Sequence, residues 1–392
     1  MAWIVAWDLI IEYLFAASAV AVGWSGYFVG LLKDLGVAVP AALSQAPLSF
    51  EGHGFVTTGA WINLPAIGLI VATAAILLAG TGHSARFNNV VVALKLVVIS
   101  LVVVFGFLHV DAANWTPFIP PREIDPAAGT DRYGVHGVFA AAGLIFFAYL
   151  GFEALSTAAQ EVKNPQRNMP IGIIGSLLIC TVLYILVSLV ITGLAPLSVL
   201  NVPAPLYAAV DHVGAALAWL KPVVTLGAAV GLASTVLVLL YGQSRIFYSM
   251  SRDGLLPAAF CRVSPRRRTP AFGTVVTAAA AAVLAGLFPI GLLGELVSVG
   301  TLISFALICG GVVYLRIKHP DQPRPFRAPF GRVTGSLGVI ACLGLATSLP
   351  GATFLRFVLW LGIGLLVYFL YARRHSVLQA QAGSDAPPAI AG

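Results

Sequence analysis

Charged residues are scarce in this sequence. Only 9% of its 392 residues are Asp, Glu, Lys or Arg, whereas about 25% are charged in an average soluble domain. So few charges do not cover a soluble surface, and a disordered chain carries more of them. The composition therefore excludes both of these classes.

Metal-binding and catalytic patterns are also missing. The four cysteines form no closely spaced pair, and none of the seven histidines has a second ligand three or four residues away. We therefore expect no metal site, disulfide framework or cofactor. No His-Glu-x-x-His or nucleophile-elbow pattern occurs in an apolar segment, so we do not expect an enzyme.

Apolar residues are abundant: they make up 59% of the chain, and the mean hydropathy is +0.94. Apolar segments of about 20 residues recur along the whole length, as in membrane-spanning helices. We predict an all-α membrane protein with about ten transmembrane helices, the first and sixth longer than a bilayer needs. The predicted spans are residues 2–29, 62–80, 88–109, 136–158, 171–194, 218–248, 271–288, 292–316, 333–349 and 353–372.

Lysine and arginine are distributed unevenly over the predicted loops. If residue 1 is cytoplasmic, 16 of the 22 lie in cytoplasmic loops or the tail and 5 on the opposite side. Because cytoplasmic loops carry the excess of these residues, we predict a multi-pass protein of the cell membrane with both termini in the cytoplasm. This topology and the lipid headgroups explain the net charge of +7 without a nucleic-acid partner.

The span at 136–158 contains residues that a membrane helix normally avoids. Residues 146–170 read FFAYLGFEALSTAAQEVKNPQRNMP, which places Gly151 and Glu153 beside an apolar run. Glycine weakens a helix, and a carboxylate in hydrocarbon costs about 2.5 kcal/mol or more. We predict a discontinuous helix whose backbone carbonyls line a cavity at mid-membrane, although close helix packing would use the same glycine.

Three ionisable residues in other spans carry most of the functional information. Asp8 and Glu12 are four residues apart on one face of the first helix, and Lys95 lies among valines and leucines. Lys95 is predicted either to change protonation during a functional cycle or to be a structural lysine with a polar partner. Glu12 is predicted to face a water-filled cavity or to form an interhelical hydrogen bond, and Asp8 is predicted to be a helix-packing or interfacial residue.

Eight segments, taken in order, resemble a known family. They read AWDLIIEY, GWSGYF, FNNVVVALK, NWTPFIP, GFEALSTAAQEVKNPQRNMPIGI, GQSRIFYSMSRDGLLP, LVSVGTLISF and PRPFRAPFG. Over residues 2–373 the chain resembles the bacterial branch of the cationic amino acid transporter family, within the amino acid-polyamine-organocation superfamily. The resemblance implies a proton-coupled amino acid permease that works by alternating access in a five-plus-five inverted-repeat fold. The span at 136–158 would be the broken sixth helix of that fold.

The resemblance also implies roles for single residues. The substrate-binding residues would be Phe146, Phe147, Ala148, Tyr149, Leu150, Gly151, Phe152 and Glu12. Among them, carbonyls at the break would receive the substrate ammonium group, the aromatic rings would form a gate or side-chain pocket, and Glu12 would line the cavity floor.

Proton coupling and a gate are implied in the same way. Lys95 would take the place of the sodium ion bound by sodium-coupled relatives, with Ser234 and Thr235 facing it. Glu161 is hypothesised to form a cytoplasmic ion-pair gate with Arg245 or Arg252, although ordinary interfacial charges would give the same pattern.

The first two helices of the family, with their glycine-rich break, have no counterpart in this sequence. Two hypotheses follow: an amino acid permease, or a non-transporting, truncated fragment of one. Residues 1–373 are predicted to form the transmembrane permease domain. The small, polar segment 374–392 is predicted to be a disordered cytoplasmic tail. The identity of the amino acid, and the choice among symport, exchange and uniport, stay open.

Overall fold

The computed structural model describes residues 2–51, 54–79, 84–123, 133–151, 164–202, 204–263, 269–321 and 328–377. Of the predicted tail, residues 374–392, the structure describes residues 374–377, and Arg374 and His375 are helical; the rest of the tail lies outside this range. The main helices are α1 (Ala2–Asp34), α2 (Leu64–Ala79), α3 (Ser84–Phe107), α4 (Gly134–Leu144), α6 (Pro165–Leu194), α9 (Leu220–Arg252), α10 (Ala271–Leu287), α11 (Ile290–Lys318), α12 (Gly331–Ala346) and α13 (Gly351–Val367).

Short elements join or extend these helices. The short helical elements are η1 (Ala41–Leu43), η2 (Ala112–Trp115), η3 (Ile145–Tyr149), α7 (Leu197–Leu200), α8 (Pro205–Val213), η5 (Gly214–Leu217), η6 (Tyr368–Ala372) and α14 (Arg373–His375). An antiparallel hairpin, β1 (Leu48–Glu51) and β2 (Gly54–Thr57), pairs Leu48 with Thr57 and Phe50 with Phe55.

A helix occupies the described part of each predicted span, which confirms an all-α membrane protein. Within the described residues, six helices are long and apolar enough to cross a membrane: Trp3–Asp34, Asn89–Phe107, Pro165–Leu194, Leu220–Arg252, Ile290–Lys318 and Gly351–His375. The apolar helices Leu64–Ala79, Gly134–Tyr149, Ala271–Leu287 and Gly331–Ala346 are shorter. The total of ten spans and the inverted repeat therefore stay predictions.

The expectation of two unusually long helices was incomplete. Helices α1 and α9 have 33 residues each, but α6 has 30 and α11 has 29. The predicted start of α6 at residue 171 came too late, because Pro165 is the first helical residue and Pro170 lies within the helix. Proline is tolerated in a first turn, where its missing N–H group is not needed. Length alone therefore does not single out α1 and α9 as a symmetric pair.

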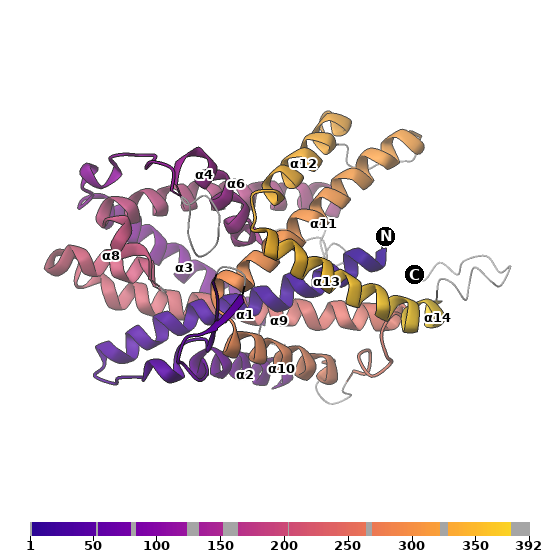
Figure 1. Ribbon diagram of the computed structural model, residues 1–392, viewed down its shortest axis with the longest axis horizontal. Coiled ribbons are helices and arrows are strands. Elements are labelled where there is room, and N and C mark those ends of the chain that lie inside the picture. The colour runs from indigo at the N-terminus through magenta and orange to yellow at the C-terminus, as the bar shows by residue number, and fades with distance from the viewer. Residues whose placement is uncertain are drawn as a thin grey trace.

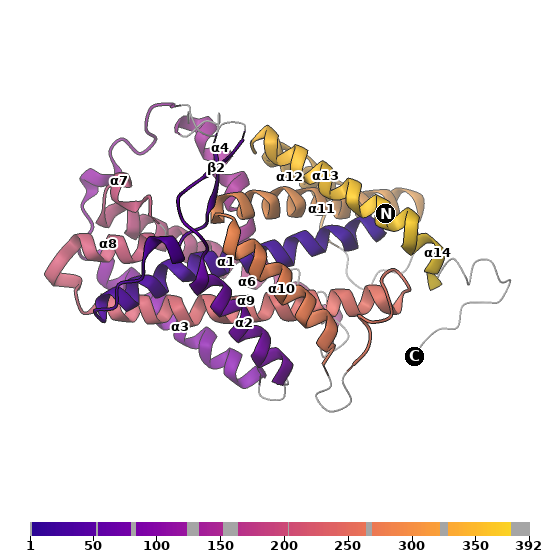
Figure 2. The ribbon, with the colours of Figure 1, turned by 60° about the horizontal axis from the view of Figure 1, so that its bottom comes forward.

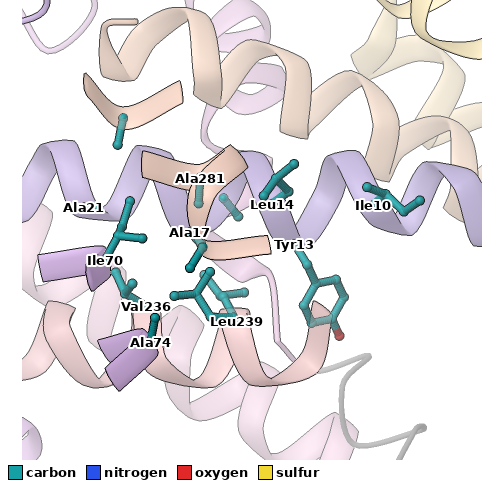
Figure 3. Packing of buried hydrophobic residues seen from close by; sticks show 14 of the residues in the cluster. Ile10, Tyr13, Leu14, Ala17, Ala21, Ile70, Ala74, Val236, Leu239 and Ala281 are labelled. Carbon is teal, nitrogen blue, oxygen red and sulfur yellow. The ribbon is translucent and has the colours of Figure 1, made fainter. Parts of the chain in front are cut away.

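Helix α1 lies at the centre of the molecule, antiparallel to α9, with α2 and α10 on one side and α11 on another (Figure 1). Small side chains allow this close approach: Ala17 and Ala21 are fully buried, and the Ser18 hydroxyl donates to the Ala281 carbonyl at 3.2 Å. Figure 3 shows Ala17, Ala21 and larger residues of α1 against side chains of α2, α9 and α10. Such packing replaces the hydrophobic effect as the force that joins helices in lipid.

Three indole rings join α1 to α13. Trp3 stacks on Trp7 with ring centroids 5.7 Å apart, and Trp7 stacks on Trp360 at 4.9 Å. The indole N–H groups of Trp3 and Trp7 donate to the carbonyls of Gly364 and Trp360, each at 3.0 Å. Gly364 leaves room for this contact, since a Cβ there would lie 2.4 Å from the Trp7 ring.

The start of α1 and the short α14 lie at the same end of the molecule (Figures 1 and 2). The end of α9 is there too, because the Val377 amide donates to the Asp253 carbonyl at 3.1 Å. This arrangement agrees with termini on one side of the membrane. Their placement on the cytoplasmic side stays a prediction.

Candidate functional site

The helix predicted to be discontinuous is interrupted in the structure. Helix α4 ends at Leu144, the chain winds more tightly through η3, and Leu150 then adopts an extended conformation. Gly151 has a φ of +118°, and a Cβ there would meet nothing within 4 Å. Because other residues rarely adopt this φ, the glycine serves the backbone turn and not close packing. Phe152 and Glu153 lie outside the described residues.

Several carbonyls released at the interruption already accept hydrogen bonds. The Phe147 carbonyl accepts from the Leu150 amide at 3.0 Å, and the Ala148 carbonyl accepts from the Tyr184 hydroxyl at 2.6 Å. The expectation of exposed acceptors therefore holds only in part. Each carbonyl has a second lone pair for a further donor.

The two faces of η3 meet different surroundings. Toward α11, the Phe146 ring lies 5.8 Å from the Phe305 ring, and the Phe147 ring lies 3.2 Å from the position of a Cβ at Gly294. One turn earlier, the Leu144 carbonyl accepts a 2.7 Å hydrogen bond from Ser298. The interrupted helix is thus seated on the first turns of α11.

Toward α6, η3 forms one wall of a cavity of about 460 Å³. The lining residues are Asn114, Trp115, Pro117, Phe118, Pro120, Ile145, Ala148, Tyr149, Tyr184, Ile185, Ser188, Leu189, Thr192 and Leu197. None of these is charged. Two donors on the wall are already engaged: the Trp115 indole donates to the Leu189 carbonyl at 3.2 Å, and the Asn114 amide to the Gly193 carbonyl at 2.9 Å. The cavity suits an apolar group.

Lys95 of α3 meets α9 at one of the two positions expected. Its Nζ donates to the Thr235 hydroxyl at 3.2 Å, and that hydroxyl donates to the Gly231 carbonyl at 3.1 Å. The lysine stem passes close to Gly231, where a Cβ would lie 3.1 Å from Cε. The Ser234 hydroxyl instead donates to the Gly231 carbonyl within its own helix, at 2.9 Å.

The acidic residues of α1 are buried. Asp8 is 2% exposed and accepts a hydrogen bond from Ser304 of α11, beside the Cα of Gly300. This contact agrees with a helix-packing role for Asp8. Glu12 is 1% exposed, and it is not among the described residues that line the cavity at η3.

The predicted gate is only half described. The Arg245 guanidinium lies 4.4 Å from the centre of the Tyr241 ring on the same helix, at a distance suited to a cation–π contact. Glu161 lies outside the described residues, so its pairing with Arg245 stays a prediction.

Two residues of the structure were missed by sequence reasoning. The Tyr184 hydroxyl donates a hydrogen bond to the Ala148 carbonyl. A tyrosine within an apolar run does not indicate which group it will bond. Gln243 of α9 is fully buried, with no hydrogen-bond partner for its amide atoms among the described residues. An amide in the predicted sixth span was the available signal for it.

Comparisons with known proteins agree with these features. The model of a family described as amino acid permease matches residues 1–380. A methylthioribose transporter of Bacillus subtilis is 45% identical over 96% of this chain and 77% of its own length. The branched-chain amino acid permease BcaP of the same species is 42% identical, again over 96% of this chain and 77% of the relative. The vacuolar cationic amino acid transporter 4 of Arabidopsis thaliana is 34% identical over 82% of this chain and 51% of its own length. With an interrupted apolar helix and a family match along nearly the whole chain, this protein belongs to the amino acid permease family.

Proposed function

We propose that this protein carries amino acids with apolar side chains across the cell membrane, coupled to protons, by alternating access. The substrate binds at the interruption between Leu144 and Gly151. Its ammonium group meets the remaining lone pairs of the η3 carbonyls, and its side chain enters the cavity between η3 and α6. The five-plus-five inverted repeat, with its two conformations, belongs to this proposal.

The cavity beside η3 is the observation that carries the choice of substrate. Its volume of about 460 Å³ accommodates a branched aliphatic side chain, and none of the described residues on its wall is charged. A lysine or arginine side chain would leave its charge unpaired there, which is costly in an apolar site. The name of the branched-chain permease that is 42% identical to this chain points the same way.

Coupling to protons is proposed to depend on Lys95. In an apolar setting a lysine ammonium group needs a hydrogen-bonding partner, and Thr235 supplies one at 3.2 Å. Loss of the proton would weaken this hydrogen bond, because a neutral amine is a poorer donor than an ammonium group, and would loosen the contact with α9. Proton binding at Lys95 is therefore linked to the position of α9 relative to α3.

Uptake by the purified protein in liposomes tests the proposal. We expect labelled leucine, but not lysine, to accumulate when a proton gradient is imposed, and the accumulation to collapse with a protonophore. Uptake equal to that of empty liposomes for all amino acids would instead support the non-transporting hypothesis. Lysine uptake without leucine uptake would contradict the apolar side-chain pocket.

The Ser188→Leu variant tests, in the same uptake assay, whether the cavity beside η3 binds the substrate side chain. Ser188 lines the cavity, and a leucine there would occupy space needed by the substrate side chain. We expect leucine uptake to fall by about tenfold or more, as for overpacked apolar sites, while alanine uptake is retained. Equal losses for both amino acids would contradict the assignment of the pocket.

Methylthioribose is a second candidate substrate, because a transporter named for it is 45% identical to this chain. A methylthio group is apolar and fits the same cavity. The sugar hydroxyls would need further partners, since wall donors such as Trp115 and Asn114 are engaged. Competition of unlabelled methylthioribose with labelled leucine separates the candidates: inhibition supports a shared site, and methylthioribose uptake without leucine uptake supports the second candidate.

A further inference from the structure

Arg356 of α13 lies in a cluster that the transport mechanism above does not use. Its guanidinium group lies 3.9 Å from the centre of the Phe50 ring on β1, and Nη1 lies 3.3 Å from Oε2 of Glu295 on α11. Oε2 of Glu295 also accepts a 2.6 Å hydrogen bond from Thr353, on the turn of α13 before Arg356. A flat guanidinium group can stack on a ring and bond a carboxylate at once, which an ammonium group does less well.

The hairpin links this cluster to a third helix, α10. On its other strand, Phe55 makes an edge contact with Phe50 at 5.3 Å and lies 6.1 Å from Phe288, directly after α10. The hairpin therefore joins the end of α10 to the beginnings of α11 and α13.

The ion pair is sheltered from solvent: the side chains of Arg356 and Glu295 are 18% and 24% exposed. Exposed ion pairs contribute little, whereas removal of one partner from a sheltered pair leaves an uncompensated charge. Thr353 is fully buried beside them. Such a pair inside membrane-spanning helices is more than an incidental surface contact.

Glu295 directly follows the residue that seats the interrupted helix. Gly294 faces the Phe147 ring, and Ser298, one turn further, donates to the Leu144 carbonyl at 2.7 Å. Residues 294–298 of α11 therefore contact the interrupted helix on one face and the Arg356 cluster on another. A shift of this segment would move the surface at Gly294 against which the Phe147 ring packs.

We propose that Arg356 is a positioning residue for transport: held between Phe50 and Glu295, it fixes residues 294–298 of α11 against the interrupted helix. This inference rests on the proposed transport function. Arg356 touches no substrate in this scheme, and it acts through Glu295 and the backbone of α11.

A set of charge-neutralising variants tests it. We expect Arg356→Gln to lower kcat per folded transporter by about tenfold, because Glu295 is left charged and partly buried without its partner. The double variant Glu295→Gln with Arg356→Gln leaves no unpaired charge and should recover to within about threefold of wild type. Arg356→Lys, which keeps the charge, should also retain more activity than Arg356→Gln. Arg374→Gln, at an exposed position in α14, is the matched control for loss of a positive charge.

Hydrogen exchange of the β1 amides supplies a readout independent of uptake. Arg356→Gln and Phe50→Ala should both speed exchange in β1, while Arg374→Gln should not. Uptake by Arg356→Gln within twofold of wild type, no rescue in the double variant, or unchanged β1 exchange would each overturn the positioning role. If the wild-type protein itself fails to transport, the proposed function has failed, and this inference falls with it.

Discussion

At the residue scale, the contact between Lys95 and Thr235 is open to a direct test. Thr235→Val keeps the shape of the side chain but removes the hydroxyl that accepts from the lysine at 3.2 Å. A hydrogen bond to a charged group contributes about 1.5–3 kcal/mol, so we expect proton-driven accumulation of leucine to fall by about tenfold or more. The measurement is the accumulation ratio in liposomes at a fixed proton gradient.

Thr225→Val is the matched control for that change. Thr225 lies on the same helix, and its hydroxyl donates to the Lys221 carbonyl within α9 at 2.9 Å. Its loss should leave the accumulation ratio near that of wild type. Equal effects of the two valine variants would show that Lys95 does not depend on Thr235.

Single contacts of this kind were only partly predictable from sequence. The sequence places Lys95 in an apolar helix, and the family resemblance pointed to Ser234 and Thr235 together. Adjacent residues on a helix point about 100° apart, so only one of them can meet the lysine directly. Gly231 packs against the lysine stem, so α9 is rotated with this face toward Lys95. This rotation brings the hydroxyl of Thr235, and not that of Ser234, to the lysine.

At the element scale, the interruption of α4 depends on the conformation of Gly151. Gly151→Ala places a Cβ on a residue with φ of +118°, although space is available for it. We expect a strain of about 1–3 kcal/mol at this position, a lower apparent Tm and loss of leucine uptake. Gly175→Ala in α6 is the control, since a Cβ there also meets nothing within 4 Å. A normal Tm and normal uptake in Gly151→Ala would contradict the requirement for this turn.

The contact between α1 and α11 provides a second test at this scale. A Cβ at Gly300 would lie 2.9 Å from the Ile11 side chain and 3.0 Å from Oδ1 of Asp8. Gly300→Ala should therefore destabilise the protein by about 1–3 kcal/mol through overpacking. Gly311→Ala on the same helix meets nothing within 4 Å and should be neutral or stabilising. Thermal unfolding in detergent compares the two; an equal Tm in both variants would contradict close packing at Gly300.

The positions of the helices were easier to predict than their interruptions and ends. Runs of apolar residues mark the spans, and Gly151 beside Glu153 marked the break. The hydrogen bond from Tyr184 to the Ala148 carbonyl depends on how α6 packs against η3, which no local pattern encodes. The early start of α6 was missed because Pro170 suggests a boundary, whereas the helix begins at Pro165, and proline is favoured as a first helical residue.

At the scale of the whole molecule, the excess of lysine and arginine on one side predicts the orientation in the membrane. Cys261 lies in the loop after α9, and Thr58 lies in the exposed segment after β2. With Cys180, Cys309 and Cys342 replaced by alanine, an impermeant maleimide should label Cys261 in inside-out vesicles and not in intact cells. A Thr58→Cys variant that also lacks Cys261 should show the opposite pattern. Labelling of Cys261 in intact cells would reverse the predicted topology.

The overall class and family followed from composition and ordered motifs, because both depend on the chain as a whole. The hairpin and its contact with Arg356 were not predicted. Residues 48–57 fall between predicted spans, and Arg356 was assigned to the side opposite the termini by charge counting alone. A contact between segments about 300 residues apart needs the three-dimensional fold.

The column formed by Trp3, Trp7 and Trp360 has an optical consequence. Stacked indoles with ring centroids 5.7 and 4.9 Å apart couple their strong electronic transitions and give a paired far-ultraviolet dichroism signal. Because the signal depends steeply on ring spacing, it reports whether α13 stays beside α1 while the protein works. This signal therefore reports, without an added label, whether α1 and α13 move together during a transport cycle.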